Sequence, residues 1–161
     1  MSRQRISLFK RNLTFLRIFI FFVLEIAFLS AGAENALNVD IGIRIENILL
    51  EIEDAYQNKD TESIMSFIDT DFPNYYFFKK NLRDNFFKVS SAKIFFVVDS
   101  CLKKDGMILI KLHWFRKIIK NHNRLFKTQG TSEFIFKEYT DPDKKEPLFK
   151  LYQIKGDNPF Y

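Results

Sequence analysis

The chain has 161 residues, with 25 Lys and Arg against 20 Asp and Glu, 20 phenylalanines and one cysteine. This length fits one domain with one hydrophobic core, and a single cysteine excludes an internal disulfide. The net charge of +5 would favour an anionic partner such as a nucleic acid, provided that the excess belongs to the folded domain.

Residues 1–33 have the composition of an export signal. Residues 1–17 contain five Lys and Arg and no acid, residues 18–29 form a 12-residue apolar run, and Ser-Ala-Gly-Ala follows. A positive stretch, a short apolar run and small residues two positions apart are what a signal peptidase recognises. We therefore expect cleavage after Ala33 and an exported protein, periplasmic or extracellular. The alternative is an uncleaved membrane anchor, which the short run and Glu25 within it disfavour.

Removing this segment changes the charge argument. Residues 34–161 hold 20 bases and 19 acids, a net charge of +1, with the two signs interspersed. We therefore expect no nucleic-acid partner, because such a partner needs a basic face on the folded domain. Cys101 is expected to be buried and inert, the alternatives being an intermolecular disulfide or a reactive thiol. The sequence contains no His, Cys and carboxylate cluster at metal-ligand spacing and no Gly-rich phosphate loop, so no metal or cofactor is expected.

After a flexible lead-in over residues 34–39, hydrophobic periodicity predicts three helices. The first covers 40–58, and its apolar face comprises Ile41, Ile45, Ile48, Leu49, Ile52, Ala55 and Tyr56. The second covers 61–69, with Asp60 as its N-cap. The third covers 75–88, and its expected inward side chains are Tyr76, Leu82, Phe86 and Phe87.

The remaining chain is predicted to form four strands, over 92–102, 107–119, 124–138 and 147–155. Asp105-Gly106 predicts a tight hairpin turn, and Asn121-His122-Asn123 a second turn. In the second strand one face comprises Ile108, Ile110, Leu112 and Trp114, and the other Met107, Leu109, Lys111, His113 and Phe115. Helices that precede strands indicate an α+β domain, with helices packed in the concavity of a curved, mainly antiparallel sheet of four to six strands.

Several segments in this order resemble the NTF2-like superfamily, which includes SnoaL-like and ketosteroid-isomerase-like domains. The segments are AYQNKD, TESIMSFI, DTDFP and the final LFKLYQIKGDNPF, whose tail has Tyr152, Ile154, Gly156, Asp157, Pro159 and Phe160. The resemblance covers nearly all of residues 40–161. It implies a cone in which the sheet wraps around the long helix and leaves a pocket at the open end. Such a pocket holds a small apolar molecule, or is filled while the domain serves as a dimerising or protein-binding module.

Enzymes of this superfamily place an Asp or His inside the cone, where burial tunes its pKa. The catalytic candidates here are Asp99, near the end of the first strand, and His113, and a structural role is the commoner one for both. No His/Asp pair occurs at a readable spacing, and no catalytic residue is carried over from the family. Tyr56 and Trp114 are the candidates for the ligand pocket, Tyr56 through its hydroxyl.

The leading hypothesis is a non-enzymatic, exported NTF2-like domain that binds a small apolar ligand or a protein, as a dimer through its sheet. The first alternative is an enzyme of the isomerase, dehydratase or cyclase type with Asp99, His113 or Tyr56 in the pocket. The second is a structural or assembly component of the cell envelope, which predicts an exposed apolar patch on the outer sheet face.

Overall fold

The computed structural model describes residues 40–120, 124–140 and 147–161. Its compact unit spans Ile41–Tyr161. The predicted export signal and lead-in, the turn at 121–123 and the segment 141–146 lie outside the described residues. No helix within the described ranges is long and apolar enough to cross a membrane.

Three helices precede the strands, as predicted: one over residues 40–57, α2 (Thr61–Ser66) and α3 (Tyr75–Phe87). Asp60 caps α2, since its Oδ1 accepts from the Ser63 backbone N–H at 3.0 Å. α2 ends earlier than predicted because the chain after it pairs with the sheet. Leu151 N–H donates to Phe67 O at 2.8 Å, and Asp69 N–H donates to Leu151 O at 2.9 Å.

The inward face of α3 differs in part from the predicted one. Phe78, Leu82 and Phe86 recur every four residues and are buried. Tyr76 and Phe87 are 85% and 88% exposed, so their assignment to the core is wrong. An aromatic-rich helix has too many apolar residues for periodicity alone to select which of them face the sheet.

The sheet contains β1 (Val89–Lys104), β2 (Met107–Lys120), β3 (Leu125–Tyr139) and β4 (Leu148–Gly156), antiparallel and in chain order. Asp105 and Gly106 have φ values of 51° and 74°, the left-handed pair that a two-residue hairpin turn requires. Lys104 therefore pairs directly with Met107. A register shift between Val98 and Ser100 makes Asp99 the extra residue of a bulge in β1.

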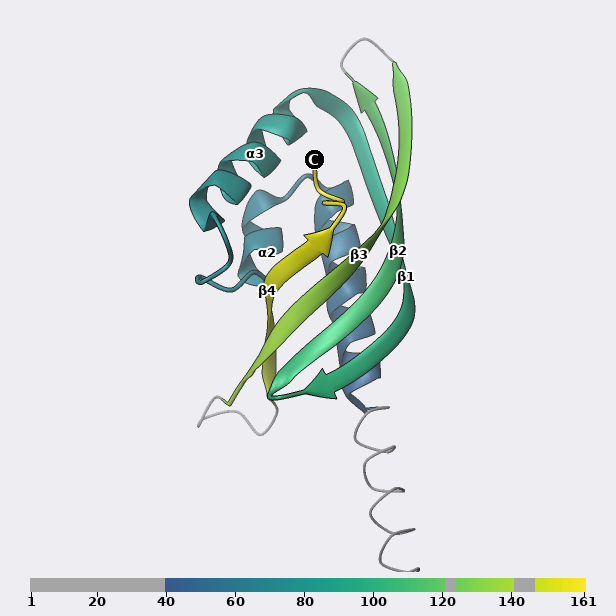
Figure 1. Ribbon diagram of the computed structural model, residues 1–161. Coiled ribbons are helices and arrows are strands. Elements are labelled where there is room, and N and C mark those ends of the chain that lie inside the picture. The colour runs from purple at the N-terminus through teal and green to yellow at the C-terminus, as the bar shows by residue number, and fades with distance from the viewer. Residues whose placement is uncertain (1–39, 121–123, 141–146) are drawn as a thin grey trace, which may run out of the picture. The chain divides into compact units, whose positions relative to one another are not determined.

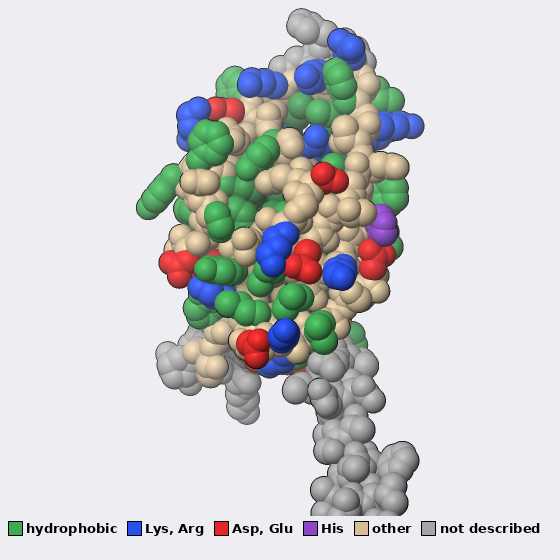
Figure 2. Space-filling view, viewed as in Figure 1, with side chains coloured by type: hydrophobic (Ala, Val, Ile, Leu, Met, Phe, Trp, Pro, Cys, Tyr) green, Lys and Arg blue, Asp and Glu red, His purple; other side chains and the backbone are tan. Residues whose placement is uncertain are grey.

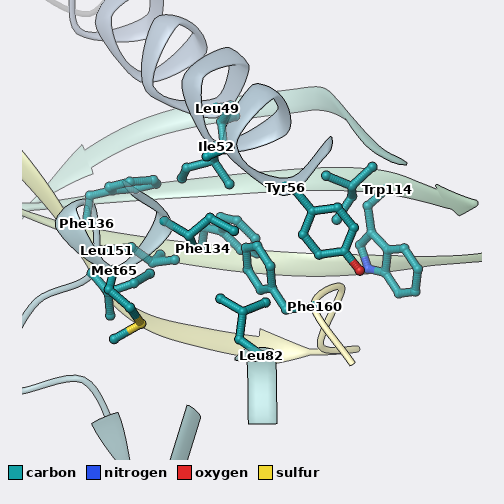
Figure 3. Close-up of a cluster of buried hydrophobic side chains, with 14 of the residues drawn as sticks. Leu49, Ile52, Tyr56, Met65, Leu82, Trp114, Phe134, Phe136, Leu151 and Phe160 are labelled. Carbon is teal, nitrogen blue, oxygen red and sulfur yellow. The ribbon is translucent and has the colours of Figure 1, made fainter. Parts of the chain in front are cut away.

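The helices lie on the concave side of the curved sheet, with the first helix running along the strands (Figure 1). The predicted alternation of β2 is confirmed, and one of its two faces is buried: Ile108, Ile110, Leu112 and Trp114 are at most 4% exposed. The chain after β4 folds back and inserts Phe160, which is 1% exposed, among the rings of Tyr56, Phe78, Phe96 and Phe134. Figure 3 shows Phe160 and Phe134 side by side in this interior. Aromatic rings therefore fill much of the cone.

Candidate functional site

A pocket of about 240 Å³ lies at the open end of the cone, where the first helix, α3, β2 and the C-terminal residues come together. Its floor is aromatic and its rim is basic. The lining residues are Tyr56, Asn85, Phe86, Lys88, Val89, Arg116, Ile118, Lys120, Phe160 and Tyr161. The pocket thus combines an apolar surface for a ring with cations for a charged group.

Tyr56 supplies the deepest polar group of this pocket. It lies in the last turn of the first helix and is 3% exposed, with its ring packed edge-on against Phe86 at 5.0 Å. Burial raises the pKa of Tyr56, while the charge of Arg116 and its hydrogen bond to the hydroxyl act in the opposite direction. Figure 3 shows the hydroxyl pointing toward the indole of Trp114. The phenol therefore stays neutral at physiological pH, as a hydrogen-bonding group at the pocket wall.

Arg116 joins three parts of the site. It stands on β2 between Ile94 of β1 and Thr128 of β3 in the pairing register. Its Nε donates to Thr128 Oγ1 at 3.1 Å, and its Nη1 donates to the Pro159 carbonyl at 3.1 Å. These bonds hold the guanidinium in place and tie the C-terminal residues to the sheet.

Two exposed lysines complete the cationic rim. Lys120 stands beside Lys88, because Val89 pairs with Lys120 in the β1–β2 register. Lys59 adds a further cation at this end, since its Nζ donates to the Val89 carbonyl at 3.2 Å. In the described part of the chain, no Asp or Glu lines the pocket. In Figure 2 lysine and arginine side chains gather at the same end of the domain, at the top of the view.

Sequence reasoning missed this basic rim because it averaged charge over residues 34–161. A local signal was present: residues 106–132 contain six Lys and Arg and no acid. The antiparallel β2–β3 pair folds this stretch onto itself, so cations distant in sequence meet at one end. Local charge runs therefore carried more information than the net charge.

The C-terminal residues form one wall of the pocket. Asp157 N–H donates to the Thr131 carbonyl at 3.1 Å, and Phe160 N–H donates to Asn158 Oδ1 at 3.0 Å. Burial raises the pKa of Tyr161, and a hydrogen bond to Asn81 of α3 opposes this rise. These contacts bridge sheet and helix across the cone.

Trp114, the second predicted pocket residue, is not among the lining residues. It is 4% exposed, and its Nε1 donates to Ser132 Oγ at 3.1 Å. Gly130 lies directly against its ring, since a Cβ at that position would come within 2.6 Å of Trp114 Cζ2. The indole is therefore a structural part of the inner sheet face.

The catalytic candidates Asp99 and His113 lie on the sheet face opposite the pocket. His113 Nδ1 is 2.9 Å from Asp99 Oδ1 and 2.7 Å from Asp99 Oδ2. The sequence showed no His/Asp pair at a readable spacing, because the two residues are 14 positions apart and meet only through the pairing of β1 with β2. Both side chains are about half exposed, at 54% and 43%, so the pair is outside the cone, contrary to the enzyme hypothesis that put it in the pocket.

Cys101 is partly buried on β1, less deeply than predicted. Burial raises the pKa of its thiol, and the negative charge of Glu46 on the first helix raises it further. A raised pKa keeps the thiol protonated and so reduces its nucleophilicity. Among the described residues, no group of three His, Cys, Asp or Glu side chains is arranged to hold a metal ion.

Comparison with known proteins identifies the fold. No family model and no curated protein matches the sequence. A conserved protein from Planctomyces limnophilus superposes with a TM-score of 0.61 at 12% identity, over 73% of this chain and 98% of that protein. An NTF2-like superfamily protein from Salmonella enterica gives 0.55 at 8% identity, over 75% and 92%. An NTF2-like family protein from Streptomyces avermitilis gives 0.56 at 11%, over 75% and 96%. The chain therefore has the α+β NTF2-like fold that the sequence predicted.

Proposed function

We propose that this protein is a binding module whose cone-mouth pocket takes a small molecule with one apolar ring and an anionic group. The observation that carries the proposal is the composition of the pocket lining. Phe86, Phe160 and Tyr56 supply aromatic surface, while the described residues of the rim include three cations and no acid. A carboxylate or phosphate at the rim would neutralise charges that the protein itself leaves close together.

The size of the pocket limits the ligand class. A volume of about 240 Å³ is below the range of about 300–1,000 Å³ that is usual for drug-sized ligands. A single substituted ring fits this space better than a steroid or a polyketide. The ring would lie on Phe160 and Phe86, and the anion would point toward Lys88 and Lys120.

Binding is a better proposal than catalysis for this pocket. Among the described residues, its lining includes no Asp, Glu or His, the usual general acids and bases for isomerisation or dehydration. The Tyr56 hydroxyl with Arg116 is suited to orient a carbonyl or carboxylate. Export of the protein, and a homodimer through the sheet, stay predictions from the sequence.

The proposal is tested by calorimetric titration of the purified full-length protein with benzoate, phenyl phosphate and neutral benzamide. Both anions should bind more tightly than benzamide. Lys88→Met and Lys120→Met should each weaken the binding of both anions about two- to fivefold, which is the scale of one exposed charge contact. The affinity for benzamide should not change. Lys104→Met, at the opposite end of β1, is the matched control and should change nothing. Equal affinities for benzamide and benzoate, unaffected by the two lysine variants, would refute an anion site.

Tyr56→Phe tests the polar end of the pocket without altering its shape. It removes the hydroxyl that Arg116 contacts and should weaken all three probes, because each has an oxygen that can reach this hydroxyl. Unchanged binding in Tyr56→Phe together with losses in the lysine variants would place the ligand at the rim alone.

A further inference from the structure

The outer face of the sheet, which turns away from the helices, carries two parallel rows of side chains that run across β1, β2 and β3. One row is Lys93, Lys117 and Lys127, since Lys93 pairs with Lys117 and Lys117 pairs with Lys127. The next row, two residues along each strand, is Phe95, Phe115 and Gln129. We call these the lysine row and the phenylalanine row.

The lysine row places like charges directly opposite one another. Neighbouring strands lie about 5 Å apart, so three ammonium groups stand within about 10 Å of sheet, an arrangement that costs stability in isolation. All three lysines are exposed, and none forms an ion pair among the described residues. The nearby acids are engaged elsewhere: Asp99 with His113, and Glu133 with Lys155. The row therefore presents uncompensated positive charge.

The phenylalanine row presents rings to solvent beside this charge. Phe95 is 51% exposed and Phe115 is 46% exposed, whereas side chains on the other face of the same strands are buried in the core. A groove of about 300 Å³ lies over part of both rows. Its lining comprises Phe95, Phe115, Arg116, Lys117, Lys127, Thr128 and Gln129. Exposed rings, hydrogen-bonding side chains and cations thus share one groove.

We propose that this face binds single-stranded nucleic acid. Rings that stand on a sheet stack unpaired bases, and lysines beside them neutralise the phosphates of the same strand. Phosphates follow about every 3.4 Å along a stacked strand, so a row of about 10 Å matches about three of them. The near-neutral net charge of residues 34–161 does not oppose this, because it averages the lysine row with the acidic first helix. The sequence prediction that excluded nucleic acid rested on that average.

Two other occupants fit the face less well. A second copy of the chain related by two-fold symmetry would set the same patch against itself, which brings two lysine rows together. An anionic bilayer would neutralise the lysines but would offer no base edge to Gln129. A nucleic acid strand uses all three kinds of side chain at once.

The test is fluorescence anisotropy of the full-length protein with a fluorescein-labelled oligothymidylate of about 15 nucleotides, in the range that single-strand binding sites cover. Lys93→Gln, Lys117→Gln and Lys127→Gln should each weaken binding about two- to fivefold and reduce the slope of log K against log salt by about 0.7. Phe95→Leu and Phe115→Leu should each weaken it about five- to tenfold, because they keep apolar area but remove the stacking ring. The five bases in residues 1–33 are the same in every variant, so differences between variants report on the sheet face.

Matched controls separate this site from general charge and hydrophobicity. Lys104→Gln removes an exposed lysine at the far end of β1, and Phe77→Leu removes an exposed ring on α3; both should bind like wild type.

The proposal is overturned if binding is absent, if heparin competes as well as DNA and the phenylalanine variants bind normally, or if all variants match their controls. It is also overturned if vesicles of phosphatidylglycerol, rather than the oligonucleotide, respond to the five variants. A homodimer by light scattering that Phe95→Leu and Phe115→Leu dissociate, with no effect on DNA binding, assigns the face to a second copy instead.

Discussion

The Nδ1 atom of His113 lies 2.9 Å from Oδ1 of Asp99, across the β1–β2 pair and outside the cone. The contact depends on the bulge at Asp99, which adds one residue to β1 between Val98 and Ser100. A bulge re-aims side chains relative to a regular strand, and here it brings the carboxylate to the histidine, in the row next to the phenylalanine row. Because both groups are about half exposed, this is a surface contact.

A double-mutant cycle with Asp99→Asn and His113→Gln measures the strength of that contact. We expect a coupling free energy of about 0.2–1 kcal/mol, because exposed charged pairs gain little over their solvated states. The coupling should fall as salt is added. Urea unfolding followed by Trp114 fluorescence measures it, with benzoate titration in parallel. If either variant abolished benzoate binding, the site would have to include the outer face.

Gly130 should tolerate no side chain. A Cβ there would meet Trp114 Cζ2 and Asp157 Oδ2, each at 2.6 Å. Gly130→Ala should therefore destabilise the fold by about 1–3 kcal/mol, the usual cost of overpacking. The control is Gly42→Ala in the first helix, where nothing lies within 4 Å of the new Cβ. That variant should stabilise by about 0.5–1 kcal/mol, because alanine favours a helix over glycine. Equal melting temperatures for the two variants would contradict the packing seen at Trp114.

Phe160 should contribute more to stability than its place next to the last described residue suggests. Its ring is 1% exposed and contacts four other aromatic rings. Phe160→Ala should cost about 3–5 kcal/mol, as large-to-small changes in a core do. Phe77→Ala, where the ring is 61% exposed, should cost much less. Thermal unfolding of both variants checks this, and a small loss in Phe160→Ala would mean that the tail does not close the cone in solution.

Glu53 gives the protein a pH-dependent contribution to stability. Burial raises its pKa above 4.5, and the hydrogen bond that its Oε1 accepts from Phe96 N–H at 2.6 Å opposes this only in part. The folded state therefore binds the proton more tightly than the unfolded state. The resulting stabilisation is fully present below pH 4.5 and is lost as the pH rises through the raised pKa.

Glu53→Gln removes this dependence, since the amide oxygen still accepts from Phe96 N–H without a charge to bury. The stability of Glu53→Gln relative to wild type should be greatest at neutral pH and should decrease as the pH falls toward 4.5. Glu51→Gln, exposed on the same helix, controls for the loss of one negative charge. Melting temperatures from pH 4.5 to 7 measure the difference, and parallel curves for wild type and Glu53→Gln would contradict it.

Much of the fold was readable from local patterns. The 3.6-residue spacing from Ile41 to Tyr56 predicted the first helix, and the Asp105-Gly106 pair predicted the turn between β1 and β2. The alternation of side chains in β2 correctly placed Trp114 and His113 on opposite faces of the sheet. These signals lie within a few residues of one another, so they need no knowledge of the rest of the chain.

The candidate sites depended on contacts that no short window contains. Tyr56 was predicted at the pocket, but Arg116, Lys88 and Phe160 join it only because three elements and the C-terminal residues meet there. Asp99 and His113 were each named, yet their pairing follows from the hairpin register and a bulge. The surplus of aromatic residues in α3 likewise left the choice of buried rings to packing.

The sequence by itself determined the elements, their order and the two faces of β2, because backbone propensity and side-chain alternation act locally. Tertiary structure decided where charge gathers. Strand register set Lys93, Lys117 and Lys127 in one row and brought Lys88 beside Lys120, although the domain as a whole is nearly neutral. Electrostatic potential depends on distances in space, and the chain order fixes these only after the strands have paired.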